Sequence, residues 1–332
     1  MLKHLKTVAL AIAVTGAVTG AVTGSATIAT AQEKVTYLFP APDFLPAFAP
    51  FQLAKSKGYY KAAGLDVDFQ VGKGGADVAK QVAVGNADLG GGIGDTPLIV
   101  RANGLTVKGV ALLGGKSLTS LYVRKDAGIK SIADLKGKNV GVLAFQDTTY
   151  YNLLAMLASA GLKKDDVSIQ AVGPAGVVQL MINGNLHAIS GVPEWAAGIE
   201  AANVPLDRFA IDQIFPAMAQ AILASDKVIA DRPKVVQGFV SATLQAISEI
   251  MADPEKAAKE YVAAVPQHAG KEKAMEAIMR RYSEFIYAPA AGSKLGQFDA
   301  ARMTVVQKFY IDNKIVETAV PVAETFTNAF VQ

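Results

Sequence analysis

The sequence predicts an α/β protein with two lobes, each a mainly parallel sheet flanked by helices, followed by a helical tail at the C-terminus. Three observations lead to this prediction. The chain has 332 residues, which suits two lobes of about 100 to 150 residues each. Short β-like runs alternate with helical patterns as far as about residue 190, as they do in βαβ units. Beyond residue 224 the pattern is helical only.

The expected strands are short runs of apolar or alternating residues bounded by Gly, Pro or Asn. They cover 35–39, 65–71, a strand entered at 87–89, 107–113, 120–125, 139–143, 167–172, 188–192 and 219–224. Residues 65–71 (LDVDFQV) alternate with a period of two, which indicates a half-buried strand.

The expected helices have helical periodicity and recognisable ends. They cover 53–63, 76–84, 97–102, 148–160, 174–182, a helix opened by Pro193, and then 233–251, 254–264, 271–285 and 298–313. Gly64 and Gly85 follow helical segments, where a left-handed residue commonly ends a helix. Ser131 and Asp134 have the spacing of a capping box.

The chain is expected to cross between the lobes twice, near 117–120 and near 215–221. The first lobe would then combine 32–120 with 217–332, and the second would be 121–216.

Residues 1–31 have the features of an export signal. Lys3 and Lys6 precede an apolar stretch of small residues (7–24), and an A-x-A site predicts cleavage after Ala31. A membrane anchor is the alternative, but Thr and Gly dilute the segment and no stop-transfer flank follows it. No other apolar run approaches 18 residues. We therefore expect a periplasmic monomer whose mature chain does not insert into the membrane.

The composition excludes several classes of function. Without cysteine the chain can form no disulfide, thiolate metal site, iron–sulfur cluster or thiol nucleophile. Lys and Arg number 32 against 29 acidic residues, and loss of the two leader lysines leaves a net charge of +1. A near-neutral chain has no electrostatic footprint for nucleic acid. We predict no cofactor and no metal site.

Enzyme motifs fail on inspection. Residues 110–117 (VALLGGKS) resemble the end of a phosphate-binding loop, but Val110 stands where its first glycine is required. His187 is expected at a turn, and His268 is expected to be solvated between two helices. The chain offers no credible catalytic set, so we predict that it is not an enzyme.

Five loops have the position in which parallel α/β sheets bind ligands, beyond the carboxyl end of a strand and before a helix. They are 40–44, 72–76, 90–97, 144–150 and 193–195, the last with the only tryptophan. Each has a structural alternative. The glycines could be turn makers, the aromatic residues could belong to the core, and the acidic residues could cap helices or face their dipoles.

A series of short motifs, in order along the chain, resembles one family. The motifs are 57–60 (KGYY), 64–67 (GLDV), 85–88 (GNAD), 132–138 (IADLKGK), 140–142 (VGV), 161–162 (GL) and 183–188 (NGNLHA). They resemble the nitrate/sulfonate/taurine-type solute-binding proteins of ABC importers, which include binders of the thiamine pyrimidine and of riboflavin. The resemblance covers nearly the whole mature chain. It implies a type II periplasmic-binding fold whose two lobes close on one ligand and deliver it to a permease with its ATPase subunits.

The ligand residues of that family fall on the loops named above and at the first crossing. Carried onto this sequence, they are Asp43, Phe44, Gly75, Ala76, Asp95, Thr96, Lys116, Gln146, Asp147, Thr148, Thr149, Tyr150, Glu194 and Trp195. The implied mechanism is aromatic stacking with hydrogen bonds, and hinge closure that removes water. These loops hold more carboxylates than cations, which favours a neutral or amine-bearing organic solute, although helix N-termini could still hold a sulfonate.

Other functions on the same fold remain as alternatives. Fungal thiamine-pyrimidine synthases are expected to share the fold only, and they use a cysteine-rich segment that this chain lacks. Effector domains of transcription regulators would need an N-terminal helix-turn-helix where the leader stands. A binding protein for a tripartite secondary transporter or for a chemoreceptor remains open.

Overall fold

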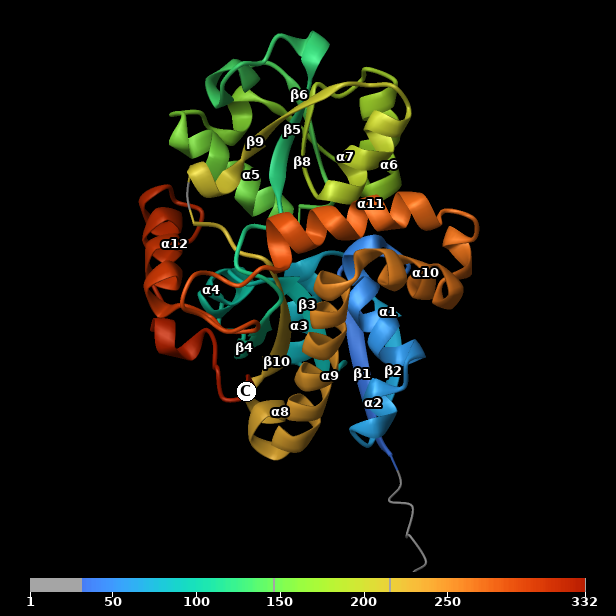
Figure 1. Ribbon diagram of the computed structural model, residues 1–332. Coiled ribbons are helices and arrows are strands. Elements are labelled where there is room, and N and C mark those ends of the chain that lie inside the picture. Colours follow the sequence, from blue (N-terminus) through green and yellow to red (C-terminus); the bar gives the residue numbers. More distant parts are fainter. Residues whose placement is uncertain (1–31, 146, 215, 332) are drawn as a thin grey trace, which may run out of the picture. The chain divides into compact units, whose positions relative to one another are not determined.

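The computed structural model describes residues 32–145, 147–214 and 216–331, so the expected export signal lies outside the described residues. Two five-stranded sheets organise this part of the chain (Figure 1). Sheet A has the order β2-β1-β3-β10-β4, and sheet B has the order β7-β6-β8-β5-β9. The strands of sheet A are β1 (Glu33–Phe39), β2 (Leu65–Val71), β3 (Leu89–Ile93), β4 (Val107–Leu112) and β10 (Gln220–Ser225). Those of sheet B are β5 (Ser120–Arg124), β6 (Asn139–Val142), β7 (Ser168–Ala171), β8 (Ala188–Gly191) and β9 (Leu206–Ala210).

Each sheet is mainly parallel, with one reversed strand. In sheet A, β10 is antiparallel to both β3 and β4, and in sheet B, β5 is antiparallel to both β8 and β9. The other pairings are parallel. In both sheets the reversed strand is the first one after the chain arrives from the other sheet. The predicted fold class is therefore confirmed.

Helices flank both sheets. The α-helices are α1 (Ala49–Ser56), α2 (Tyr59–Ala62), α3 (Gly75–Ala83), α4 (Thr96–Arg101), α5 (Thr148–Ser159), α6 (Gly173–Ile182), α7 (Pro193–Ala201), α8 (Asp226–Asp231), α9 (Pro233–Ala252), α10 (Pro254–Ala264), α11 (Glu272–Tyr282) and α12 (Ala300–Asp312). A π-helical turn spans Ser283–Tyr287, and short 3-10 turns lie at Pro46–Phe48, Lys125–Ala127, Ile132–Leu135, Lys164–Asp166, Ile211–Gln213, Pro266–His268 and Val322–Glu324.

The long helix α9 belongs to the core of sheet A. Phe239 stacks on Tyr37 of β1 at 5.0 Å and on Tyr60 of α2 at 4.7 Å between ring centroids. Within the described chain α9 is the one helix long and apolar enough to span a membrane, but half of its apolar window is buried inside the fold. Its apolar face is explained by this packing, which removes apolar surface from water.

The structure corrects several sequence predictions. Gly90, Gly91 and Gly92 were expected in a ligand loop, but they lie in the buried strand β3. An added Cβ would lie 2.4 Å from Val78 at Gly90 and 2.9 Å from Leu223 at Gly92, so these glycines let α3 and β10 approach β3 closely. The helix expected over 53–63 is two helices, because left-handed Gly58 (φ 77°) separates them. Strand β9 and helix α8 were not predicted.

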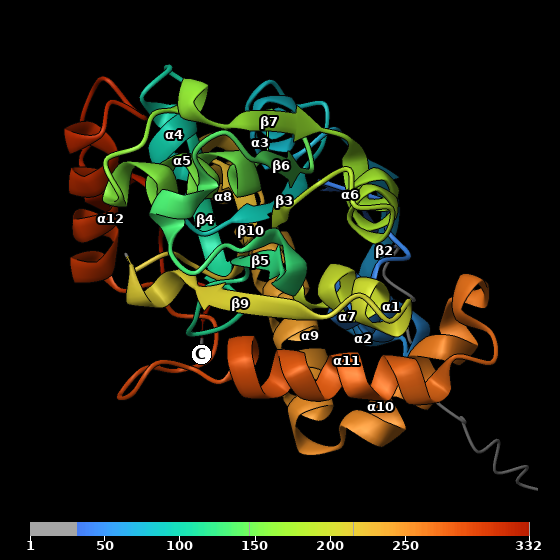
Figure 2. The ribbon, with the colours of Figure 1, turned by 90° about the horizontal axis from the view of Figure 1, so that it is seen from above.

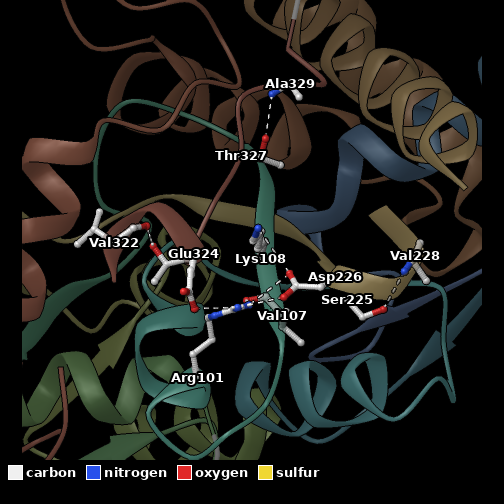
Figure 3. A network of polar contacts seen from close by, with 11 residues as sticks. Arg101, Val107, Lys108, Ser225, Asp226, Val228, Val322, Glu324, Thr327 and Ala329 are labelled. Atoms are coloured by element: carbon white, nitrogen blue, oxygen red, sulfur yellow. Dashed lines mark hydrogen bonds and ion pairs between the residues drawn. The ribbon is translucent and has the colours of Figure 1, made fainter. Parts of the chain in front are cut away.

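The C-terminal segment covers the edge strand of sheet A. Phe326 forms a parallel bridge with Gly109 of β4. Figure 3 shows the adjoining charges, where Arg101 pairs with Asp226 at 3.0 Å and with Glu324 at 3.4 Å, and Lys108 reaches Asp226 at 3.7 Å. A covered edge cannot pair with a second chain.

Two crossover segments join the sheets, 113–119 after β4 and 211–219 after β9. Asp212 of the second segment accepts a hydrogen bond from the Ser117 backbone N–H of the first at 3.1 Å. Arg302 of α12 binds both segments, because its guanidinium donates to the carbonyl oxygens of Gly115, Pro216 and Ala217. One side chain thus joins both connections between the sheets.

Replacing Arg302 by Lys should destabilise the protein, since an ammonium group cannot reach three carbonyls as the planar guanidinium does. Hydrogen bonds from a charged group contribute about 1.5–3 kcal/mol each, so we expect a loss of about 2 kcal/mol or more and a fall in Tm of roughly 4 °C. Urea and thermal unfolding measure it. The matched control is Arg280→Lys, whose exposed side chain pairs with Glu276 one helical turn away, and it should change Tm by less than about 1 °C. Equal effects of the two variants would contradict the role of Arg302.

Candidate functional site

A small cavity lies where loops from both sheets meet, with a volume of about 50 Å³. Its walls combine residues before, within and after strands of the two sheets. They are Pro40, Ala41, Leu45, Ala47, Phe48, Gly92, Ile93, Leu118 and Gln220 on one side, with Leu143, Asp147, Thr149, Val192, Glu194 and Trp195 on the other. A volume of this size holds a few water molecules but no organic solute. Binding of a solute therefore requires the two walls to move apart.

Three buried polar atoms around this cavity have no hydrogen-bond partner among the described residues. They are Oγ1 of Thr149, Oε1 of Glu194 and Nε1 of Trp195. A buried polar group without a partner costs about 1–3 kcal/mol, so each favours a bound group that satisfies it. Together they provide a hydroxyl, a carboxyl oxygen and an N–H donor, which is a set suited to recognition of a polar organic molecule.

Glu194 lies in the first turn of α7, directly after β8, and is 8% exposed. The hydroxyl of Tyr282 donates to its Oε2 at 2.5 Å. Burial raises the pKa of the Glu194 carboxyl to about 7, against the smaller opposing effect of the Tyr282 hydroxyl. Near neutral pH this carboxyl can therefore accept a hydrogen bond as a carboxylate or donate one as an acid.

Trp195 is 5% exposed and packs closely on the end of β8. An added Cβ on Gly191 would lie 2.7 Å from Cε3 of the indole, so Gly191 provides the space that the ring occupies. The ring is largely buried, as the core alternative predicted, and it also lines the cavity; stacking on a ligand stays a prediction.

Asp147 connects its wall of the cavity to the start of α3, which packs on sheet A. Its Oδ1 accepts from the Thr149 backbone N–H at 2.8 Å, which confirms the expected N-cap of α5. Its Oδ2 accepts from the backbone N–H of Gly75, at the start of α3, at 3.2 Å. Gly74 is left-handed (φ 98°), and an added Cβ there would lie 3.1 Å from Asp147, so the two chains approach as closely as glycine permits.

Asp95 is placed differently from Asp147, although both precede a helix. No side-chain hydrogen bond from Asp95 caps α4. Its Oδ2 accepts from the hydroxyl of Tyr310 at 2.8 Å, and that hydroxyl lies 3.1 Å from Oδ1 of Asn152. Burial raises the pKa of Asp95 to about 6, against the opposing effect of the Tyr310 hydroxyl. Asp95 does not line the cavity and instead links α4, α12 and α5.

Several other predicted site residues lie outside the small cavity. Thr96 Oγ1 accepts from the Ile93 N–H, Lys116 is exposed, and the Asp43 carboxylate accepts from Gln52. Gly75 and Ala76 open α3, and Tyr150 is half-buried beside Phe145. Gln146 lies outside the described residues, as does the side chain of Thr148 at the start of α5.

Phe44 lines a second and larger hollow, of about 790 Å³, which adjoins the small cavity. His268 lines the same hollow and is 8% exposed, so the expectation of a solvated histidine was wrong. Its Nε2 lies 2.6 Å from the Phe44 carbonyl oxygen, because the turn between α10 and α11 packs over that loop. Leu45, Phe48 and Gln220 were also missed: Leu45 directly follows the predicted loop 40–44, Phe48 lies in a 3-10 turn, and Gln220 begins β10.

A third hollow, of about 370 Å³, lies beside the crossover segments and includes Ser117, Arg208 and Arg281. None of its described lining residues carries a buried polar atom without a partner. The small cavity and the hollow that adjoins it are therefore the better candidates for a binding site.

Two curated relatives illustrate what the chain is similar to. It is 26% identical over 289 residues to the riboflavin-binding protein RibY of Chloroflexus aurantiacus, covering 86% of this chain and 82% of that protein. It is 27% identical over 259 residues to the 4-amino-5-hydroxymethyl-2-methylpyrimidine phosphate synthase THI13 of Saccharomyces cerevisiae, covering 71% and 72%. The likeness to the synthases thus extends to the sequence, whereas we had expected it in the fold only.

Solved structures share the fold. One from Bordetella bronchiseptica RB50 is 26% identical, with a TM-score of 0.75 over 91% of this chain and 96% of that one. The alkanesulfonate-binding protein SsuA from Xanthomonas axonopodis pv. citri is 18% identical, with a TM-score of 0.68 over 90% and 98%. The arrangement of two mainly parallel sheets is therefore that of periplasmic solute-binding proteins.

A family model described as NMT1/THI5 like matches residues 45–257, which is more than half of the chain. The matched segment includes β2 to β10 and nearly all of the cavity walls described above. The family resemblance inferred from the sequence motifs is therefore confirmed, and the chain belongs to the NMT1/THI5-like family.

Proposed function

We propose that the chain is the solute-binding component of an ABC importer, exported to the periplasm, where it captures one small organic solute as a monomer. The observation that carries the proposal is the cavity built by both sheets, with three buried polar atoms that a solute would satisfy. The names of the relatives support it, since RibY and SsuA are named as binding proteins. A permease and its ATPase subunits would receive the solute.

The binding motion in this proposal is a change in the angle between two lobes. Lobe 1 combines 32–120 with 217–332, and lobe 2 is 121–216. The division of strands between the sheets supports these bounds, since each crossover segment lies at a lobe boundary. The hydrogen bond from the Gly75 N–H to Asp147 would form on closure and hold the walls together. Opening would break it and admit the solute.

The cavity supports a neutral or amine-bearing solute over a small anion. Asp147 and Glu194 contribute carboxyl groups, and none of the described lining residues is Lys or Arg. Nitrate or a short sulfonate would lie against these carboxyls without a cationic partner, which is unfavourable in a water-poor site. A heteroaromatic ring with hydrogen-bonding edges can stack on Trp195 and satisfy the polar atoms.

The proposal includes binding without conversion of the solute. Some relatives are named as synthases, so the absence of a reaction in this chain needs a test of its own. Mass spectrometry of solute recovered after prolonged incubation should find it unchanged. Neighbouring genes separate the remaining alternatives, since large membrane subunits without an ATPase would indicate a tripartite secondary transporter.

The ligand class can be tested on protein refolded to remove bound solute. The panel contains riboflavin, aminopyrimidines, aromatic amines and carboxylates, taurine, alkanesulfonates and nitrate. A heteroaromatic or amine at about 1,000 times its Kd should add roughly 4 kcal/mol of stability and raise Tm by several degrees. The same ligand should change the fluorescence of Trp195, the only tryptophan of the chain.

Matched variants connect the result to the cavity. Thr149→Val keeps the side-chain shape but removes the unpartnered hydroxyl, and it should weaken binding by about 5- to 10-fold. The control Thr304→Val changes an exposed position of α12 and should leave affinity unchanged. Stabilisation by nitrate and sulfonates alone would contradict the ligand class, and stabilisation without a change in Trp195 fluorescence would contradict the site.

Glu194 should make both stability and binding depend on pH. Its pKa is raised from 4.5 to about 7 on folding, so between these values the folded state binds more protons than the unfolded state. The free energy of unfolding therefore falls as pH rises through this window, by up to about 3 kcal/mol from this group. Asp95 acts in the same direction between pH 3.8 and about 6. An amine solute should bind more tightly as pH rises past 7, because ionised Glu194 pairs with it.

Urea unfolding at pH 5 and pH 8 tests this dependence. Glu194→Gln should lose less stability than the wild type over that interval, and its affinity for an amine should no longer rise with pH. Glu317→Gln, at an exposed position, serves as the control and should behave as the wild type. If the Glu194→Gln protein kept the full wild-type slope, the assignment of the raised pKa to Glu194 would be wrong.

A further inference from the structure

The larger hollow is an apolar groove formed by five segments. It lies among the loop 42–46, α6, α7, the turn 266–271 and α11. Helix α11 packs against α7 (Figure 2). Small and apolar residues make up most of its walls, among them Ala175, Val178, Ala197, Gly198, Met275 and Ile278. Its volume of about 790 Å³ falls within the roughly 300–1,000 Å³ typical of sites for drug-sized ligands.

The groove is continuous with the small cavity. Leu45, Glu194 and Trp195 line both, so the carboxyl and the indole stand at the junction of a narrow polar space and a wide apolar one. At the junction, Oε1 of Glu194 and Nε1 of Trp195 are the buried atoms without partners. In this arrangement, a molecule whose polar end lies at this junction extends along the groove, because the small cavity of about 50 Å³ has no room for it.

His268 adds a third buried polar atom to the groove. Its Nε2 lies 2.6 Å from the Phe44 carbonyl oxygen, which only accepts hydrogen bonds, so Nε2 carries the proton. In the neutral ring Nδ1 is then an acceptor, and it has no partner among the described residues. The groove thus combines one N–H donor, one ring acceptor and one carboxyl within walls that are otherwise mainly apolar.

We propose that the solute is an amphiphilic organic molecule. Its hydrogen-bonding head, neutral or amine-bearing, binds at Glu194 and Trp195, and its apolar ring system or chain lies in the groove between α7 and α11. This inference rests on the proposed function and specifies the substrate class of the same site. Apolar surface buried in the groove supplies affinity, and the three polar atoms at and beside the junction supply orientation. Among the charged residues that line the groove, Arg281 of α11 pairs with Glu200 of α7 at 3.2 Å, and Lys271 adds one more positive charge.

Gly198 of α7 permits a test that fills the groove without harming the fold. Beyond the backbone of α7 and the two adjoining residues, the described atoms place only Val178 Cγ1, at 3.7 Å, within 4 Å of an added Cβ there. Leu is also a better helix former than Gly. Gly198→Leu should therefore fold at least as well as the wild type while occupying part of the groove. Ala277→Leu fills the groove from α11 instead, and Ala301→Leu, at an exposed position of α12, is the matched control.

Two probes distinguish binding of the polar head group at the junction from binding of the apolar part in the groove. N-phenyl-1-naphthylamine is an uncharged arylamine with a large apolar body, and 4-aminopyrimidine is a head group alone. Both are titrated against refolded protein by Trp195 fluorescence, with calorimetry as a second readout. We expect Gly198→Leu and Ala277→Leu to weaken the naphthylamine at least 10-fold and to change the affinity for 4-aminopyrimidine less than 2-fold. Ala301→Leu should change neither.

Different outcomes overturn different statements. Equal naphthylamine affinity in the wild type and both groove variants would overturn the groove as a ligand subsite, as would equal weakening of both probes. If the variants bound both probes normally but failed to support uptake in cells, the groove would contact the permease and the inference would be wrong. In each case binding of panel solutes at Trp195 would leave the proposed function standing. Failure of every probe and panel solute to bind the wild type would overturn both.

Discussion

The chain passes between the two sheets through two crossover segments, and Arg302 binds both of them. Its guanidinium comes from α12, almost at the end of the chain, and it binds carbonyl groups from segments about 100 residues apart. The Ser117–Asp212 hydrogen bond adds a direct connection between them. Because the cavity has one wall from each sheet, its width depends on the angle at these segments. A rigid pair of crossovers permits rotation about one region and resists sliding of one sheet past the other.

Two buried carboxyl groups, those of Asp95 and Glu194, have different roles in this fold. Asp95 accepts a hydrogen bond from Tyr310, whose hydroxyl also contacts Asn152, so this carboxyl helps to connect three helices in the interior. One oxygen of the Glu194 carboxyl accepts a hydrogen bond from Tyr282, and Glu194 lines the cavity. Burial raises the pKa of both groups, and the physical cause is the same. What distinguishes them is the presence of a cavity beside Glu194, which only the folded chain reveals.

Local signals in the sequence were sufficient to predict much of the fold. The alternation of residues 65–71 predicted β2 with its observed bounds, and Pro254 with the helical periodicity that follows it predicted α10. Asp147, Glu194 and Trp195, which line the cavity, were among the predicted residues because strand-to-helix loops carry a local pattern. Other features depend on distant segments. Glycines 90–92 looked like a loop because close packing against Val78 and Leu223 leaves no trace in their own neighbourhood. His268 was read as solvated because the loop that covers it is more than 200 residues away.

The position of β10 has a consequence for the order in which the protein can fold. All five strands of sheet B lie between residues 120 and 210, whereas sheet A needs β10 between β3 and β4 and Phe326 at its edge. A chain emerging from the ribosome can complete sheet B while sheet A still lacks a central strand. Closing so long a loop carries an entropic cost and slows folding. Sheet A therefore stays without a central strand until the chain is free as far as Ser225, at a point when all the strands of sheet B have already emerged.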